Sequence, residues 1–345
     1  MGRSELKRDV PLSLKSHPGF RRIFSPGKMT LGLMFPIEPL YGHLFPRMSE
    51  EIALAKTVED AGFGALWVRD VPLHVPSFKN VGQIFDIWIW LATIAAHTNH
   101  MALCTGALVL PLRHPIHTAK AAASLDILSG GRLVAGMASG DREIEYPAFN
   151  VDYDKRGEVF REHVAFYEHL LQEHFVEFEN SFGHLKDADL IPKPQSERIP
   201  LLVVGEARQK VEWIAAHADG WAMYFREPEV QRERVQIWKD ACNSVGTNVF
   251  KPFVQGLNLD LVEDADAKPE AIRGGWKVGN KSLLEKLKEC EAAGVNHTFI
   301  HCWDCNRPTH EIIEELTETI LPHFPVDTSV PARSMSSFDP DSGAQ

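Results

Sequence analysis

Short apolar runs and amphipathic segments alternate along most of the chain. The apolar runs are typical of strands buried on both faces, as in a parallel sheet. The segments between them repeat their apolar residues every three or four positions, which is the spacing of one helix face. The pattern predicts strands at 30–35, 65–68, 102–110, 133–137, 201–204, 221–224, 253–262 and 297–301. It predicts helices at 49–61, 85–97, 115–129, 157–174, 210–217, 230–244, 282–293 and 311–321.

Eight strand–helix units in a row predict the α/β class and a (β/α)8 barrel. The turns DAGFGALWV, SGGRLVAGM and AAGVNHTFI support this prediction, because each places glycine between a helix and the next strand. An open doubly wound sheet is the alternative, but its GxGxxG signature does not follow the first strand. We expect one barrel domain over residues 26–325 and aperiodic tails at 1–25 and 326–345, the second disordered.

Composition narrows the class of protein. Of the 345 residues, 44% are hydrophobic and 24% are charged, as in a soluble globular protein. The formal net charge of −11 argues against nucleic-acid binding, which needs a basic face. The five cysteines are scattered through the chain, unlike the disulfide framework of a small secreted protein. No apolar run approaches the roughly 18 residues of a membrane span. The basic N-terminus lacks the apolar core of a secretory signal, so we expect a cytoplasmic protein that binds no membrane.

Two strand ends carry residue types that suit a bound phosphate or a flat ring. The run GGRLVAGMASGD ends in Ala138, Ser139 and Gly140, whose small side chains let backbone N–H groups approach a ligand. In LLVVGEARQK, Gly205-Glu206-Ala207 joins a strand to a helix, where free N–H groups attract anions. Lys210 would add positive charge there. An ordinary strand-to-helix turn is the alternative.

Other chemistry-bearing residues give weaker signals. HCWDC contains one Cys-x-x-Cys pair, Cys302 and Cys305, without a second pair, so we expect no metal site. Trp303 within it is a candidate wall of a substrate pocket. Arg113, just past the third strand, is a candidate contact for an anionic substrate or for a loop salt bridge.

Four segments together resemble the bacterial-luciferase-like flavin monooxygenase family, which also contains deazaflavin-dependent members. They are AGFGALWVRD (61–70), TGALVLPLRHPIHTAKAAASLDILSGGRLVAGMASGD (105–141), VVGEARQKVEWIAAHADGW (203–221) and KSLLEKLKECEAAGVNHTFIH (281–301). They follow the family's order and spacing from Leu31 to His301. The chain is most similar to the subgroup of luciferase-type oxidoreductases that has no agreed substrate.

The resemblance implies an activity and partners. A monooxygenase of this kind oxidises a small organic substrate with O2, using reduced FMN that a separate flavin reductase supplies, and we expect a homodimer. Two alternatives stay open on this fold. One is an oxidoreductase that transfers hydride with the deazaflavin F420, and the other is a flavin-binding barrel without catalysis. A metal-dependent hydrolase is disfavoured, because FPIEPLYGH lacks a His-x-His after the first strand.

The resemblance also assigns cofactor-binding residues. It places a non-proline cis peptide bond at Gly106–Ala107, as a bulge behind the flavin ring. It implies that the ring lies across the small residues of the fourth strand end. The expected cofactor-binding residues are Gly106, Ala107, Ala138, Ser139, Gly140, Gly205, Glu206, Ala207 and Lys210.

The chain departs from the family at its catalytic positions. Many members end the second strand with an acid followed by histidine, whereas here Asp70 is followed by Val71. His74, three residues further on, is the candidate acid/base, with Asp70 and Arg113 as the other candidate catalytic residues. Ala138 stands at the position of luciferase's reactive cysteine, so we expect no thiol chemistry. Ser139 stands where luciferase has arginine, and Lys210 is the candidate replacement for that positive charge.

Overall fold

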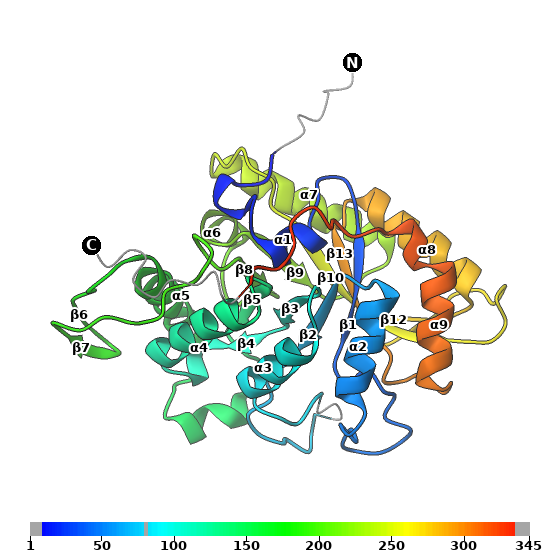
Figure 1. The fold of residues 1–345 in the computed structure, drawn as a ribbon, viewed down its shortest axis with the longest axis horizontal. Helices are drawn as coiled ribbons and strands as arrows, with labels where there is room; N and C mark the ends of the chain where they lie inside the picture. Colours follow the sequence, from blue (N-terminus) through cyan, green and yellow to red (C-terminus); the bar gives the residue numbers. More distant parts are fainter. Residues whose placement is uncertain (1–8, 79–81, 335–345) are drawn as a thin grey trace.

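Eight parallel strands close into a barrel in the computed structural model, which describes residues 9–78 and 82–334 (Figure 1). The order β10-β13-β1-β2-β3-β5-β8-β9 closes because β9 also pairs with β10. The predicted barrel is therefore confirmed. The strands are β1 (Thr30–Met34), β2 (Ala65–Val68), β3 (Ala102–Thr105), β5 (Leu133–Ala138), β8 (Leu201–Val204), β9 (Gly220–Met223), β10 (Phe253–Leu261) and β13 (His297–His301).

Helices cover the outside of the barrel and bury one face of every strand. Their apolar stripes and the outward strand residues form one large buried cluster. The helices are α2 (Glu51–Ala61), α3 (Ile87–His97), α4 (Pro115–Leu128), α5 (Arg156–Gln172), α6 (Val211–His217), α7 (Pro228–Ser244), α8 (Asn280–Ala293) and α9 (Thr309–Thr319). Among the described residues, none of the helices combines the length and the apolar character needed to cross a bilayer.

The inward-facing residues form a second buried cluster that the N-terminal segment closes from below. Phe20 and Phe24 are fully buried in this cluster with inward residues such as Trp67 and Phe299. Phe20 belongs to α1 (Pro18–Ile23), which lies at the opposite end of the barrel from the loops after β1 and β2 (Figure 1). The sequence pattern assigned residues 1–25 to a tail. One short helix that plugs a barrel has no local periodicity, so only tertiary packing reveals it.

A histidine network links the plug to the barrel. Trp67 Nε1–H donates to His297 Nε2 at 3.0 Å, and His297 Nδ1 lies 2.7 Å from Thr30 Oγ1. Thr30 Oγ1 donates in turn to the Ile23 carbonyl at 2.8 Å. Because Nε2 accepts, Nδ1 carries the proton, and burial lowers the pKa of His297 to about 3. Every polar atom of this ring is thereby satisfied.

The C-terminal segment also packs against the closed end. Asp327 pairs with Arg21, and the Arg333 amide donates to the Gly130 carbonyl at 2.8 Å. The predicted tails therefore include ordered chain at both ends, and their remaining parts, 1–8 and 335–345, lie outside the described residues.

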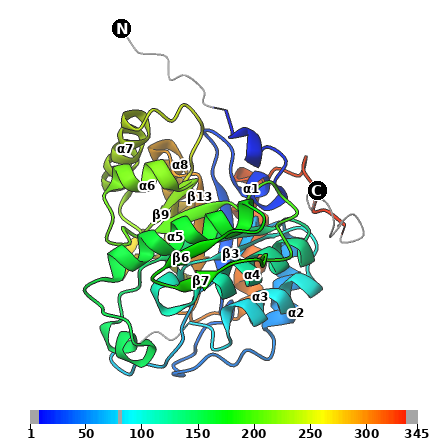
Figure 2. The ribbon, with the colours of Figure 1, turned by 90° about the vertical axis from the view of Figure 1, so that its left-hand side faces the viewer.

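Two hairpins extend the barrel. β6 (Phe178–Asn180) and β7 (Gly183–Leu185) pack beside α5, with the Phe166 and Phe178 rings 4.4 Å apart (Figure 2). β11 (Glu270–Ile272) and β12 (Gly275–Val278) occupy the stretch between β10 and α8, where β12 pairs with β10.

Candidate active site

The carboxyl ends of the barrel strands surround a mouth, where barrels of this kind hold their active sites. Side chains alternate along a strand, so every second residue points inward. On β2, Ala65 and Trp67 belong to the interior cluster, and Arg69 is the next inward position. On β13, Phe299 belongs to that cluster, and His301 is the next inward position. Arg69 and His301 therefore form part of the top inward layer.

The third strand breaks at the position that the resemblance predicted. β3 ends at Thr105, the Gly106–Ala107 peptide bond is cis, and the strand resumes as β4 (Leu108–Val109). The predicted cis peptide bond is therefore confirmed. A Cβ at Gly106 would lie 2.9 Å from the Trp67 ring and 3.1 Å from Met34 Cε, so glycine is the residue that fits this bulge.

Strand register brings the predicted cofactor-binding residues side by side. Val109 is paired with Ala138, and Met137 with Val203, so the ends of β4, β5 and β8 are neighbours. These ends carry almost no side-chain bulk. We call Gly106, Ala107, Ala138–Gly140 and Gly205–Ala207 the bare side of the mouth.

The loop from β8 to α6 has an unusual backbone. Gly205, Ala207 and Arg208 have φ angles of 67°, 44° and 61°, and Gln209 N donates to the Glu206 carbonyl at 2.7 Å. Two successive non-glycine residues at positive φ carry a cost that typically marks a functional site. Within the described residues, the N–H groups of 206, 207 and 208 have no hydrogen-bond partner. Turned N–H groups of this kind form concavities that bind anions.

The end of β5 is supported from behind by a buried tyrosine. The hydroxyl group of Tyr146 donates to the Ser139 carbonyl, and burial raises the pKa of Tyr146. Gly140 has a φ of 78°, and a Cβ there would lie 2.5 Å from that hydroxyl and 2.7 Å from Val109 Cγ1. Only glycine therefore fits position 140 without moving the backbone of the bare side.

An arginine that the sequence analysis did not select lies beside this loop. Arg156, at the start of α5, lies 3.5 Å from the Tyr153 ring centroid and donates to the Tyr153 carbonyl at 2.6 Å. Its enclosed Nε has no partner among the described residues. The next residue, Gly157, accepts from Gln209 Nε2 at 2.8 Å, which joins α5 to the β8–α6 loop. Lys210 is exposed at the start of α6.

Two of the three candidate catalytic residues form a salt bridge with each other. Arg113 donates to both carboxylate oxygens of Asp70, at 2.9 and 2.7 Å, and Val109 N donates to the same carboxylate at 3.1 Å. The pair fixes the end of β2 to the chain after β3. His74 lies apart in an exposed loop, with its ring 5.1 Å from the Phe45 ring and, among the described residues, no hydrogen bond to Asp70 or Arg113.

The opposite side of the mouth carries large side chains. The His301 and Trp303 rings stack 4.5 Å apart at an angle of 14°, and the Arg69 guanidinium lies 5.5 Å from the Trp303 ring. Burial, and secondly Arg69, lower the pKa of His301 to about 3. We call Arg69, His301 and Trp303 the aromatic wall. Arg69 lies two residues after the inward-facing Trp67, and His301 lies two residues after the inward-facing Phe299. This alternation along the strands is the sequence signal that would have selected both residues.

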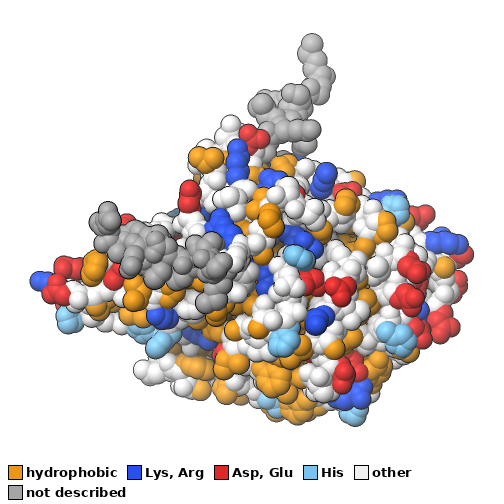
Figure 3. Space-filling view, in the orientation of Figure 1, with side chains coloured by type: hydrophobic (Ala, Val, Ile, Leu, Met, Phe, Trp, Pro, Cys, Tyr) orange, Lys and Arg blue, Asp and Glu red, His pale blue; other side chains and the backbone are white. Residues whose placement is uncertain are grey.

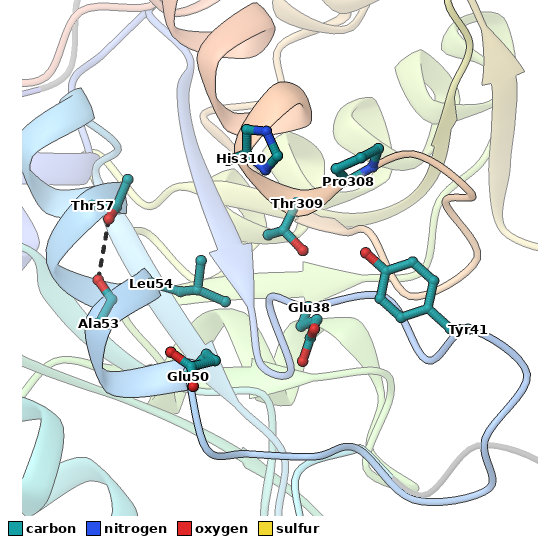
Figure 4. Close-up of a pocket in the computed structure, with 9 residues that line it drawn as sticks. All are labelled: Glu38, Tyr41, Glu50, Ala53, Leu54, Thr57, Pro308, Thr309 and His310. Carbon is teal, nitrogen blue, oxygen red and sulfur yellow. Dashed lines mark hydrogen bonds between the residues drawn. The ribbon is translucent and has the colours of Figure 1, made fainter.

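Two cavities lie around the mouth. One of about 340 Å³ adjoins the Asp70–Arg113 pair and is otherwise lined by Val71, Pro72, Ile84, Phe85, Asp86, Leu112 and Phe149. The other, of about 310 Å³, lies between α2 and the start of α9 (Figure 4). Its lining includes Glu38, Tyr41 and His310 and none of the bare side.

Exposed apolar side chains surround the mouth. They belong to the loops after β1, β2 and β5 and include Leu44, Phe45, Leu73, Phe78 and Ile144. Hydrophobic side chains gather along the lower edge of Figure 3, where the loops after β1 and β2 lie in Figure 1.

The Cys302 and Cys305 thiols are buried in the packed part of the protein. Both thiols are free and buried, and Cys305 Sγ–H donates to the Leu259 carbonyl at 3.0 Å. No group of three or more His, Cys, Asp or Glu side chains in the described part of the chain has an arrangement that could hold a metal ion.

Curated relatives cover much of the chain at modest identity. An uncharacterized protein of Mycobacterium tuberculosis is 28% identical over 233 residues, which are 63% of this chain and 81% of that protein. The F420-dependent glucose-6-phosphate dehydrogenase of Kineococcus radiotolerans is 28% identical over 172 residues. That match covers 48% of this chain and half of the enzyme.

Solved structures share the fold over most of their length. The monooxygenase RslO1 of Streptomyces bottropensis has a TM-score of 0.71 at 20% identity, covering 86% of this chain and all of that one. An F420-dependent secondary alcohol dehydrogenase with an F420–acetone adduct has a TM-score of 0.70 at 16% identity, covering 85% of this chain and 98% of that one. The FMN-bound oxygenating constituent of a Pseudomonas putida diketocamphane monooxygenase has a TM-score of 0.66 at 14% identity, covering 87% of this chain and all of that one.

The family itself follows from a direct match. The model of the family described as luciferase-like monooxygenase matches residues 29–252, most of the chain, including the bulge, the end of β5 and the β8–α6 loop. This match agrees with the resemblance carried by the four sequence segments. Members include FMN-dependent and F420-dependent oxidoreductases. The chain belongs to the luciferase-like monooxygenase family.

Proposed function

We propose that this protein is a monooxygenase that binds reduced FMN on the bare side and oxidises a small organic substrate with O2. The observation that carries the proposal is the left-handed loop Gly205–Arg208, whose free N–H groups suit the flavin phosphate. Lys210 supplies positive charge at the same place, and Arg156 directly precedes Gly157, which accepts a hydrogen bond from Gln209 of this loop.

The rest of the bare side fits the flavin ring. A planar ring needs a flat surface without protruding side chains, and Gly106, Ala107 and Ala138 offer one across two neighbouring barrel strands. When bound, the flavin supplies the redox chemistry. The surrounding chain binds its phosphate, orients its ring and keeps water out, and the apolar loop residues around the mouth serve that last role.

The catalytic candidates divide into two roles. Asp70 and Arg113 are positioning residues, because they neutralise each other and fix two strand ends. His74 is exposed on a loop beside the mouth and is our candidate acid/base, although it needs a loop movement to reach a substrate. A separate reductase and a homodimer stay predictions of the family resemblance.

A second candidate is hydride transfer with F420. Its phosphate would use the same loop, and its anionic tail needs cations beyond the phosphate. Arg208 and Lys210 are exposed there, and Arg161 on the next turn of α5 donates to Gln209 Oε1 at 2.9 Å. This local positive charge contrasts with the net charge of −11, and F420-dependent enzymes are among the relatives.

A parallel titration distinguishes the candidates. The purified full chain is titrated with oxidised FMN, reduced FMN without oxygen, riboflavin and F420, and binding is followed by fluorescence and absorbance. Tightest binding of reduced FMN, with riboflavin much weaker, supports the monooxygenase. Tightest binding of F420 supports hydride transfer. Failure of all four ligands to bind would overturn both candidates.

A further inference from the structure

Two polar ring atoms in the aromatic wall have no partner. His301 Nδ1 and Trp303 Nε1 are both enclosed, and neither makes a hydrogen bond within the described residues. The Trp303 side chain is only 6% exposed. A buried donor without an acceptor costs about 1–3 kcal/mol, and such groups in native proteins normally meet a ligand or an ordered water.

The same two ring types, deeper in the barrel, provide an internal comparison. Trp67 and His297 also stack, with centroids 5.7 Å apart, and their polar atoms are all satisfied by each other and by Thr30. His297 and His301 lie on one strand, two inward positions apart. The unsatisfied pair therefore occurs at the mouth, where a ligand can arrive, and the satisfied pair occurs in the core.

The charges around the wall are of both signs, and the group in contact with the wall is a guanidinium. Arg142 and Asp141 both act electrostatically on Arg69, and Arg273 acts on the nearby Tyr224. Arg142 lies 3.4 Å from Glu145. Arg69 is the guanidinium that lies on the Trp303 ring, and the exposed Asp304 follows Trp303 in the chain. Trp303 is a pure donor, and the neutral His301 ring has one N–H.

We propose that Trp303 and His301 bind the carboxylate of a small organic acid, beside the positive charge of Arg69, and that this acid is the substrate. The inference rests on the proposed function, because a substrate must lie at the mouth beside the bare side. The Trp303 indole N–H donates to one carboxylate oxygen, and the His301 N–H donates to the other. The Leu40 amide donates to the Trp303 carbonyl at 3.1 Å, so the β1–α2 loop holds the wall in place.

The test compares benzoate with benzamide, its neutral amide. Both are titrated by calorimetry into the purified full chain, without flavin and again with FMN. We expect benzoate to bind at least tenfold more tightly than benzamide. Trp303→Phe keeps the stacked ring and removes the N–H, so we expect about a fivefold loss of benzoate affinity with little change in benzamide affinity.

A matched control lies outside the mouth. Trp213 stacks on His217 at 4.4 Å and 15°, almost the geometry of Trp303 on His301, and it lies on α6. Trp213→Phe should leave benzoate affinity unchanged. His301→Gln serves as the second variant if Trp303→Phe unfolds, and circular dichroism checks each fold.

The outcomes separate the two proposals. Absence of benzoate binding, equal affinity for benzoate and benzamide, or wild-type benzoate affinity in both wall variants would overturn the inference. Absence of FMN and F420 binding, together with the expected benzoate pattern, would leave the anion site standing and overturn the proposed function.

Discussion

The bare side and the aromatic wall face each other across one mouth, yet they are built in opposite ways. The bare side presents mainly backbone, glycine and alanine, with the exposed Glu206 side chain in its last loop, and its unpartnered N–H groups belong to a loop with three residues at positive φ. The aromatic wall presents the guanidinium of Arg69 and the imidazole of His301 on inward positions, and the indole of Trp303 two residues after His301. A phosphate and a flat ring can be recognised by main chain alone. A smaller ligand offers few atoms, so its recognition depends on specific side chains.

The salt bridge that fixes the end of β2, next to Arg69, to the chain after the Gly106–Ala107 bulge should give the largest effect. The Asp70 side chain is 3% exposed, and its carboxylate accepts two hydrogen bonds from Arg113 and one from the Val109 amide. Asp70→Asn removes the nearer of two carboxylates beside Arg113 and leaves Asp86 at 3.6 Å, and breaking a largely buried pair in this way costs about 3 kcal/mol. We expect that loss in the free energy of unfolding, measured with urea.

An exposed pair provides the control for Asp70. Glu38 pairs with Arg47, whose side chain is 62% exposed, so Glu38→Gln should cost less than about 1 kcal/mol. Equal losses for Asp70→Asn and Glu38→Gln would contradict a structural role for the Asp70 pair.

The second-largest expected effect is a loss of FMN affinity caused by a change confined to the bare side. In Gly140→Ala the new Cβ meets Tyr146 and Val109 while the backbone stays at positive φ. The strained backbone and the displaced Tyr146 and Val109 side chains then disturb the end of β5, and we expect FMN affinity to fall roughly 100-fold, about 2.7 kcal/mol. Gly27→Ala is the control, because Gly27 has a φ of 71° and nothing within 4 Å of a new Cβ. Unchanged FMN affinity in a folded Gly140→Ala variant would remove position 140 from the cofactor site.

The bare side was largely predictable from the sequence, because its signals are local. Glycine and alanine at strand ends stand out in any single sequence. The predicted limits of β2, β8 and β13 agree with the structure residue by residue. The bulge at Gly106–Ala107 and the neighbouring strand ends followed from the family segments and from strand order.

The aromatic wall was only partly predictable, because its signals are tertiary. Trp303 was selected as a pocket wall, but Arg69 and His301 look like ordinary residues at strand ends until the barrel shows which face points inward. The Asp70–Arg113 pair depends on the contact between β2 and the loop after β3. The same limit applies to the helix starts. The helix predicted from residue 49 begins at Glu51 without a side-chain cap, whereas the helix predicted from residue 85 begins at Ile87 with Asp86 as its cap.

An acid titration compares the wall with the core below it. Burial lowers the pKa of both His301 and His297 to about 3. Each ring therefore contributes stability that is complete above pH 6.5, its ordinary pKa, and is lost as the pH falls toward 3, because the unfolded chain takes up the proton first. His301→Asn should reduce the slope of unfolding free energy against pH by about 1.4 kcal/mol per pH unit in that window.

The free energy of unfolding at neutral pH then distinguishes His301 from His297. His301→Asn loses no hydrogen bond of the described chain, whereas His297→Asn disrupts the contacts to Trp67 and Thr30. We expect only His297→Asn to lower stability clearly at pH 7.5. A similar loss at that pH for His301→Asn would mean that the wall is as fully satisfied as the core.

The smallest expected effect concerns the charge at the edge of the bare side. Lys210 is exposed, so water screens its attraction for the flavin phosphate, and Lys210→Met should weaken FMN binding about fivefold, roughly 1 kcal/mol. Riboflavin has no phosphate, so its affinity should stay unchanged. Lys186→Met, after the β7 strand, provides an exposed lysine away from the mouth and should alter neither ligand. Equal losses of FMN and riboflavin affinity for Lys210→Met would remove Lys210 from the proposed phosphate site.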